Sequence, residues 1–123
     1  MPDSKKSDTV RALFTAFLSQ DRKAADALLS DGFTFTSPYD DAIDRAAYFE
    51  RCWPNSKHLK THVIEKILAE HDGAFVMYRA STTDGSEFRN TERFEFDGDQ
   101  IKSVDVFFGA TYKDGRFVKQ VPG

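Results

Sequence analysis

Four Asp-Gly dipeptides divide the second half of the chain, at residues 72–73, 84–85, 97–98 and 114–115. The segments between them, AFVMYRAST, SEFRNTERFEF and QIKSVDVFFGATY, are rich in β-branched and aromatic residues. An Asp-Gly pair between two such segments is a strong hairpin signal, because both turn residues tolerate positive φ. The pattern predicts an antiparallel meander of about four strands, with the segment FTFTS (33–37) joining at one edge.

The first half of the chain has a helical period instead. Apolar residues recur on one helix face at Val10, Leu13, Phe14, Phe17 and Leu18. We expect this helix to begin at an N-cap formed by Ser7 or Asp8.

Two shorter helices should follow the first. One is predicted at about 22–29, capped by Asp21 and stopped at Gly32. The other is predicted at about 44–53 and ends at Pro54. Helices followed by strands favour an α+β class, in which a curved antiparallel sheet wraps around the N-terminal helices and leaves a cavity on its concave side. We expect residues 1–123 to form a single domain.

Composition excludes several classes of protein. The 123 residues carry 17 Lys and Arg against 20 Asp and Glu, for a net charge of -3, whereas nucleic-acid-binding domains usually carry a basic excess. No apolar stretch approaches the ~20 residues of a membrane helix, and the polar N-terminus lacks a secretory signal. We therefore expect a cytoplasmic protein without nucleic-acid or membrane partners. A lone Cys52 excludes a disulfide framework.

Two segments carry a resemblance to a known family. They are ALLSDGFTFTSP (27–38) and NTERFEFDGDQIKSVDVFFGA (90–110). Together with the first helix they resemble the nuclear transport factor 2-like fold, in its SnoaL-like and ketosteroid-isomerase-like branch. The resemblance implies a cone-shaped α+β barrel, one apolar pocket per chain, and a homodimer formed through the outer face of the sheet.

The same resemblance implies three catalytic positions. The carboxylate base of ketosteroid isomerases falls on Ser37, and their helix-borne Tyr falls on Leu13. Their protonated acid falls on Glu92, which is a homologous acid. Because a hydroxyl cannot replace a carboxylate base without its own activator, steroid isomerisation by that mechanism is not expected.

Strand alternation indicates which side chains meet in the pocket. On the long strand Asn90, Glu92, Phe94 and Phe96 share one face. The family pattern adds, as pocket residues, Ser37, Tyr39, Trp53, Met77, Arg79, Ser81, Val104, Val106 and Phe108.

Glu92 and Arg79 would then be neighbours, which allows two interpretations. Either the pair faces a ligand, with Glu92 as the catalytic acid or base and Arg79 and Tyr39 orienting an oxygen, or it is a structural ion pair inside a filled cone. Without the pairing, burial would raise the pKa of Glu92 and suit it to general acid–base catalysis near neutral pH.

Three other residues carry alternatives. His62 is either a structural residue or part of the pocket mouth, and it has no second ligand at metal-binding spacing. Asp40 is either a catalytic carboxylate displaced from the family position or part of a turn, with Asp44 as a helix cap. Cys52 is expected to be a small buried apolar residue.

These observations predict a small-molecule pocket protein. It would be a cofactor-independent isomerase, cyclase or hydratase acting on a small apolar or polyketide-like substrate by proton transfer. The alternatives are a ligand-binding module without catalysis and a structural dimeric domain. We expect neither a metal nor a cofactor, since no phosphate-binding, nucleophile-elbow or kinase motif is present.

Overall fold

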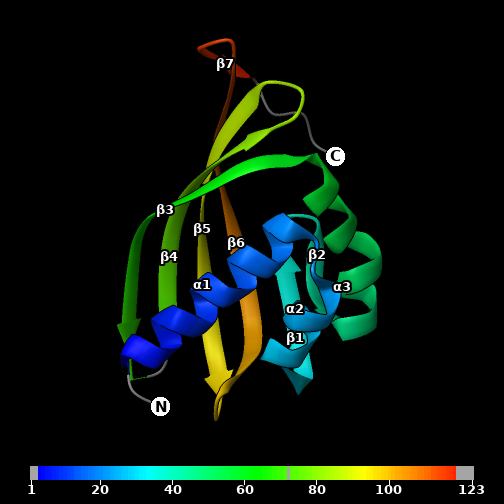
Figure 1. Ribbon diagram of the computed structural model, residues 1–123, viewed down its shortest axis with the longest axis vertical. Coiled ribbons are helices and arrows are strands. Elements are labelled where there is room, and N and C mark those ends of the chain that lie inside the picture. Colours follow the sequence, from blue (N-terminus) through cyan, green and yellow to red (C-terminus); the bar gives the residue numbers. More distant parts are fainter. Residues whose placement is uncertain (1–2, 72, 119–123) are drawn as a thin grey trace.

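Helices from the first half of the chain cover one face of a curved sheet (Figure 1). The computed structural model describes residues 3–71 and 73–118. The helices are α1 (Asp3–Ser19), α2 (Arg22–Leu28), α3 (Arg45–Arg51) and the 3-10 helix η1 (Trp53–His58). The strands are β1 (Leu29–Ser37), β2 (Asp40–Asp44), β3 (Leu59–Glu70), β4 (Gly73–Thr82), β5 (Ser86–Asp97), β6 (Gln100–Lys113) and β7 (Arg116–Val118). The predicted α+β class is confirmed.

The sheet contains the predicted meander and two strands that were not expected. Its order is β2-β1-β6-β5-β4-β3, with β7 paired to β6. Strands β3 to β6 form the antiparallel meander. Strand β1 joins it beside β6 in parallel orientation, and β2 pairs antiparallel with β1. The unexpected strands are both short: β2 lies at one edge of the sheet, and β7 pairs with residues 111–113 near the end of β6.

Helix α1 packs with the predicted face inward but begins earlier than predicted. Val10, Leu13 and Phe14 are buried in the core. The helix starts at Asp3 and not after Ser7 or Asp8. The reason is a tertiary anchor: the buried Lys6 ammonium donates to the carbonyl oxygens of Glu70 at 2.5 Å and His71 at 2.7 Å, where β3 ends.

Helices α2 and α3 have the predicted caps. A carboxylate oxygen of Asp21 accepts from the Ala24 N–H at 3.1 Å, and one of Asp44 accepts from the Ala47 N–H at 2.9 Å. Gly32 does not stop α2 as predicted, because the chain is already extended at Leu29 and Gly32 lies inside β1.

The expected orientation of β4 is wrong by one residue. Met77 and Arg79 were expected to point inward, yet both are exposed on the outer face of the sheet. Tyr78, Val76 and Ala80 are buried on the inner face instead.

The loop after β4 explains this difference. Three residues, 83–85, connect Thr82 to Ser86. The Gly85 N–H donates to the Thr82 carbonyl at 3.1 Å, and Gly85 has φ +88°. A one-residue change of loop length shifts the strand pairing by one, which turns every side chain to the other face. Tyr78 therefore lies opposite Asn90, on the face that also carries Glu92.

None of the helices that the structure describes is both long and apolar enough to cross a membrane.

Candidate functional site

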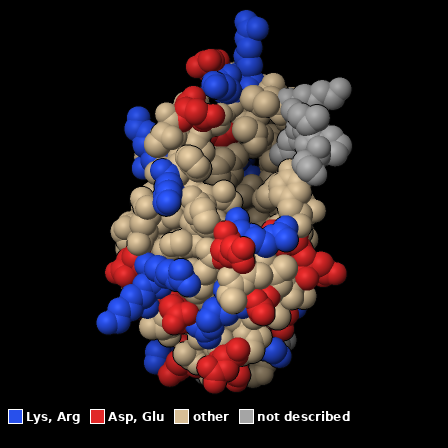
Figure 2. All heavy atoms as spheres, turned by 90° about the vertical axis from the view of Figure 1, so that its right-hand side faces the viewer, with Lys and Arg blue, Asp and Glu red and all other residues tan. Residues whose placement is uncertain are grey.

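A cavity of about 750 Å³ lies between the concave face of the sheet and the helices. Its walls come from α1, α3, η1, the turn between β1 and β2, and the inner face of β3 to β6. Figure 2 shows a hollow bordered mostly by uncharged residues on the side of the molecule where α3 lies. The apolar lining residues are Leu13, Phe14, Phe17, Phe35, Leu59, Phe88, Val104, Val106, Phe108 and Val118. The volume is in the range of sites that hold drug-sized molecules.

Glu92 is part of a chain of hydrogen bonds in the cavity wall. The Tyr78 hydroxyl donates to Glu92 Oε2 at 2.6 Å, and the Asn90 side-chain amide donates to the Tyr78 oxygen at 3.1 Å. The Gly109 N–H donates to Asn90 Oδ1 at 3.2 Å. Asn90 and Tyr78 are both buried, so this chain holds Glu92 in a fixed place.

The surroundings of Glu92 favour its protonated form. Burial raises the pKa of its carboxyl to about 7, and the hydrogen bond from Tyr78 opposes this rise. Among the described residues no Lys or Arg forms an ion pair with Glu92. The expected Arg79–Glu92 pair is absent because Arg79 points to the other side of the sheet. The predicted pairing of Glu92 with Arg79 is therefore wrong, both as a ligand-facing pair and as a structural ion pair, while the role of Glu92 itself stays a prediction.

Two residues at α3 face the same carboxyl. Burial raises the pKa of the Tyr48 phenol, and the nearby Cys52 and Glu92 raise it further. Burial raises the pKa of the Cys52 thiol to about 12, and the charges of Glu92 and Asp40 add to this. Both groups are therefore neutral at pH 7. Cys52 is half-buried and lines the cavity, within electrostatic reach of both carboxyls.

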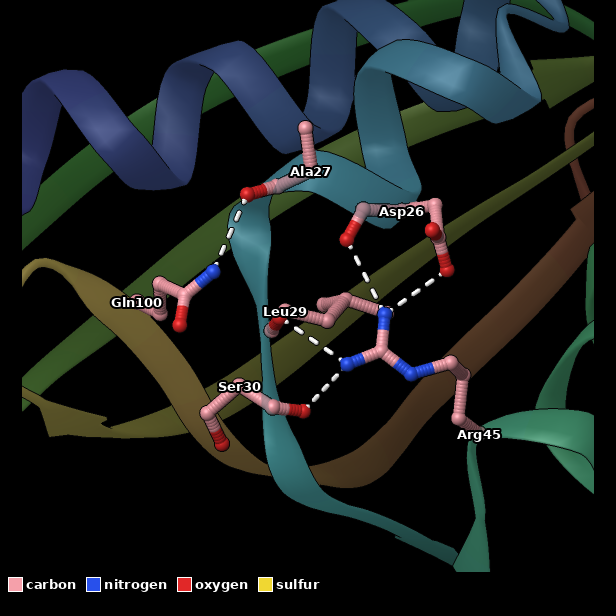
Figure 3. Close-up of polar contacts among 6 residues, drawn as sticks. All are labelled: Asp26, Ala27, Leu29, Ser30, Arg45 and Gln100. Carbon is pink, nitrogen blue, oxygen red and sulfur yellow. Dashed lines mark hydrogen bonds and ion pairs between the residues drawn. The ribbon is translucent and has the colours of Figure 1, made fainter.

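A single arginine fixes the helix that carries these residues (Figure 3). The Arg45 guanidinium donates to the Asp26 carbonyl at 3.0 Å and to the Asp26 carboxylate at 2.7 Å. It also donates to the Leu29 carbonyl at 3.0 Å and to the Ser30 carbonyl. Since Arg45 is the first residue of α3, these bonds attach the start of the helix to the junction of α2 and β1.

His62 lies on the cavity wall formed by β3. Its ring stacks on Phe14 with centroids 4.8 Å apart and meets the edge of Tyr78 at 5.0 Å. Burial lowers the pKa of the imidazole to about 4, and a hydrogen bond with the Phe14 backbone opposes this effect. The imidazole is therefore neutral at pH 7.

A second carboxylate lies on the cavity wall where the turn between β1 and β2 approaches α3. The Ser37 hydroxyl donates to Asp40 Oδ2 at 3.0 Å, and Arg51 Nη2 lies 2.8 Å from Asp40 Oδ1. Tyr39 is 56% exposed and its ring centroid is 5.5 Å from that of Phe108. Asp40 is thus held by one hydrogen bond and one ion pair, while the aromatic pair contributes an exposed apolar edge.

The structure places most of the expected site residues on the cavity wall. These are Ser37, Tyr39, Asp40, His62, Glu92, Val104, Val106 and Phe108. Six expected residues are absent from the wall: Met77, Arg79 and Ser81 because of the orientation of β4, Phe94 and Phe96 because they pack in or against the core, and Trp53. The Trp53 ring is instead buried against Phe17 at 5.3 Å and Phe49 at 5.4 Å, where η1 packs on α1 and α3.

Sequence reasoning missed Tyr48, Arg51 and Tyr78 as wall residues. Tyr78 could have been found by treating the Asp84-Gly85 loop as a three-residue connection, which places Tyr78 beside Asn90 and Glu92. Nothing local in the sequence marks Tyr48 or Arg51, because their positions depend on how α3 packs.

The residues that the structure describes include no group of three or more His, Cys, Asp or Glu able to hold a metal ion. The ionisable side chains on the cavity wall are Asp40, Glu92, Arg51, Cys52, His58, His62, Tyr39, Tyr48 and Tyr78.

Comparison with known proteins identifies the family. A family model for the SnoaL-like domain matches residues 10–104. The chain belongs to the SnoaL-like family. No curated protein matches the sequence significantly.

Solved structures share the fold of this SnoaL-like protein at low sequence identity. An NTF2-like protein of unknown function from Cytophaga hutchinsonii is 21% identical with a TM-score of 0.70, covering 84% of this chain and 88% of its own. A "putative ketosteroid isomerase" from Kribbella flavida is 17% identical with a TM-score of 0.73, covering 98% and 93%. IdmH, a "putative polyketide cyclase" from Streptomyces antibioticus, is 16% identical with a TM-score of 0.73, covering 84% and 91%. These similarities show the nuclear transport factor 2-like fold.

Proposed function

We propose that this SnoaL-like protein binds a small, largely apolar molecule with a carbonyl group and catalyses proton transfer on it, as an isomerase, cyclase or hydratase does. The observation that carries the proposal is Glu92, a carboxyl in a mostly apolar cavity that forms no ion pair with any described residue and has a pKa of about 7. Such a group can give and accept a proton near neutral pH, which is the requirement for general acid–base catalysis.

Asp40 supplies the second proton-transfer group of the proposed mechanism. Its carboxylate lines the same cavity, and the Ser37 hydroxyl and Arg51 stabilise its charge. Asp40 would remove a proton from the carbon next to the carbonyl while Glu92 donates its proton to the carbonyl oxygen, which gives an enol. For a β,γ-unsaturated ketone the product is a dienol, and return of the proton from Asp40 to its γ-carbon, with return of the enol proton to Glu92, gives the α,β-unsaturated isomer and regenerates both groups. No atom or electron is left over.

The names of two similar structures support this chemical class. One is named a "putative ketosteroid isomerase" and the other a "putative polyketide cyclase". At 16–17% identity the similarity extends to the fold and not to a particular substrate.

A thermal-shift screen followed by an activity assay tests the proposal. The panel contains ring ketones, aromatic hydroxyketones and polyketide fragments. A ligand at about 100 times its Kd adds about 2.7 kcal/mol to the free energy of unfolding, which raises Tm by several degrees. Any ligand that binds is then assayed for conversion with the wild type, Glu92→Gln and a control, Glu95→Gln, on the same strand.

We expect Glu92→Gln to keep its fold and its ligand but to lose at least about 100-fold in turnover. Glu95→Gln should behave as the wild type, because Glu95 lies three residues away and opposite Ser103, outside the cavity wall. Unchanged turnover in Glu92→Gln would contradict the proposal.

Binding without turnover is the second candidate function. The Asp40–Arg51 ion pair favours it, since a carboxylate engaged by an arginine at 2.8 Å is less free to act as a base. In that case ligands would raise Tm in the wild type and in Asp40→Asn, and no ligand would be converted.

We also propose that two chains associate through the outer face of the sheet. Large apolar side chains there are exposed, among them Phe75, Met77 and Phe107 at 49%, 41% and 56%. Charges of both signs surround them, including the Arg89–Glu65 pair at 2.8 Å. A self-complementary patch of this kind suits a twofold dimer. Sedimentation equilibrium should give twice the 14.0 kDa chain mass, and Met77→Glu should give the monomer. A wild-type monomer would refute the dimer.

A further inference from the structure

Three hydrogen bonds connect Gly109, Asn90, Tyr78 and Glu92 in series, and in each of them the group farther from Glu92 is the donor. A backbone N–H can only donate, so the Gly109 N–H fixes the Asn90 amide with its oxygen toward β6. The Asn90 nitrogen therefore faces the Tyr78 oxygen, and the single Tyr78 proton goes to Glu92 Oε2. Each group is a donor to the next, and Glu92 is the final acceptor.

This direction determines where an acidic proton can sit on Glu92. Oε2 accepts the Tyr78 proton and so keeps the character of a carbonyl oxygen, which leaves Oε1 to carry the acidic proton. A carboxylic hydroxyl oxygen is a weaker acceptor than a carbonyl oxygen, so a proton on Oε2 would weaken the hydrogen bond from Tyr78.

We infer that Tyr78 and Asn90 are positioning residues, which hold the Glu92 proton on Oε1 and make the deep end of the cavity specific for a ligand oxygen that accepts a hydrogen bond, such as a ketone oxygen. Tyr78 cannot serve as a second donor to the ligand, because its proton is already engaged. The inference rests on the proposed function, in which Glu92 is the acid that faces the ligand.

Several other ionisable groups line the same cavity and bear on its pH dependence. They are Tyr48, Cys52 and Arg51 from the α3 region, His58 from η1, His62 from β3 and Asp40 from β2. Tyr48 and Cys52 have raised pKa values and His62 a lowered one, so all three stay neutral between pH 5.5 and 8.5. Asp40 is paired with Arg51. All titrations are made in a His58→Gln background, which removes the remaining imidazole on the wall.

The first measurement follows the ionisation of Glu92 directly, without a ligand. The side-chain carboxyl carbons of glutamate are labelled with ¹³C, and the Glu92 signal is assigned by its loss in Glu92→Gln. We expect a midpoint near pH 7 in the starting protein and a higher midpoint in Tyr78→Phe, because the lost hydrogen bond favours the carboxylate. Asn90→Leu should raise it less, since it only weakens the donor.

Tyr112→Phe is the matched control for the loss of a phenol hydroxyl. Tyr112 is exposed on β6 and lies outside the cavity wall. The Glu92 midpoint in Tyr112→Phe should therefore equal that in the starting protein. Should Tyr78→Phe fail to fold, Asn90→Leu alone decides the matter. An unchanged midpoint in the folded variants would overturn the inference.

The second measurement compares the binding of 1-tetralone, whose oxygen only accepts, with that of 1-tetralol, which also donates. Above the Glu92 midpoint we expect the affinity for the ketone relative to the alcohol to fall by up to tenfold per pH unit. Tyr78→Phe should move this fall to higher pH, and Glu92→Gln should abolish it. A ratio that does not vary with pH would overturn the acceptor specificity.

The two proposals fail in distinguishable ways. If a ketone is bound and converted with dependence on Glu92 but the Tyr78→Phe midpoint is unchanged, the proposed function stands and the positioning role is wrong. If the midpoint moves as expected but no ketone binds, the proposed function and the ligand specificity are wrong, while the positioning of the proton is upheld.

Discussion

Glu92 and His62 are both partly buried, and replacing them should change the pH dependence of stability in opposite directions. The pKa of Glu92 rises from an ordinary 4.5 to about 7 in the folded chain. The folded state therefore binds more protons than the unfolded state, so stability is lost as pH rises from about 4.5 to 7. The pKa of His62 falls from 6.5 to about 4. Here the folded state binds fewer protons, and stability is lost as pH falls from about 6.5 to 4.

The two effects nearly cancel in the wild type. At about 1.4 kcal/mol per pH unit, Glu92 lowers the free energy of unfolding by about 2 kcal/mol between pH 5 and 7.5. Over the same range His62 raises it by about 2 kcal/mol. We therefore compare the change in the free energy of unfolding from pH 5 to pH 7.5 between proteins. This change should be about 2 kcal/mol more positive in Glu92→Gln than in the wild type. His62→Gln should show the reverse.

Urea unfolding at the two pH values measures these differences by linear extrapolation. The amide of Glu92→Gln still accepts the Tyr78 hydrogen bond, so the variant tests the charge and not the loss of a contact. Every other titrating group is shared with the wild type and drops out of the comparison. The same pH dependence in Glu92→Gln, His62→Gln and the wild type would refute the reasoning.

Three further predictions follow from contacts around the cavity. Arg45→Ala should lower the free energy of unfolding by about 2–3 kcal/mol, as measured by urea unfolding. Arg45→Lys should recover little of this loss, because an ammonium cannot reproduce the guanidinium fork. A loss of less than about 0.5 kcal/mol in Arg45→Ala would contradict the prediction. Native Cys52 should resist a thiol reagent at pH 8 and react after unfolding, given its raised pKa, and rapid native labelling would show otherwise. Gly109→Ala should lower the free energy of unfolding by about 2 kcal/mol or more, because an added Cβ would lie 1.9 Å from the Arg89 carbonyl oxygen. Gly32→Ala is the control, and it should change the stability little because the space around Gly32 is open. Equal melting temperatures of the two variants would contradict this account.

The sequence was sufficient for the fold class because its turns are local signals. The Asp-Gly pairs mark the hairpins, and Asp21 and Asp44 cap the helices that follow them. Glu92 was placed on the inner face correctly, since its strand alternates clearly between Phe94 and its charged neighbours. These features depend on a few adjacent residues, which a sequence displays directly.

The parts that failed depend on contacts between distant segments. On β4 both faces carry apolar residues, Phe75 and Met77 outside and Val76 and Tyr78 inside, so hydrophobic alternation could not choose between them. The choice came from the length of one loop. Likewise, the start of α1 depends on Lys6 reaching the carbonyl oxygens at the end of β3, 64 and 65 residues away.

Hydrogen–deuterium exchange next to a ketone tests the central claim most directly. The protein is incubated in D₂O with a ring ketone that raises its Tm, and the loss of the α-proton signal is followed by NMR. The account predicts that the wild type accelerates this exchange and that Glu92→Gln loses most of the acceleration while still binding the ketone. Exchange at the same rate with wild type, Glu92→Gln and no protein would contradict a proton-transfer role for the cavity.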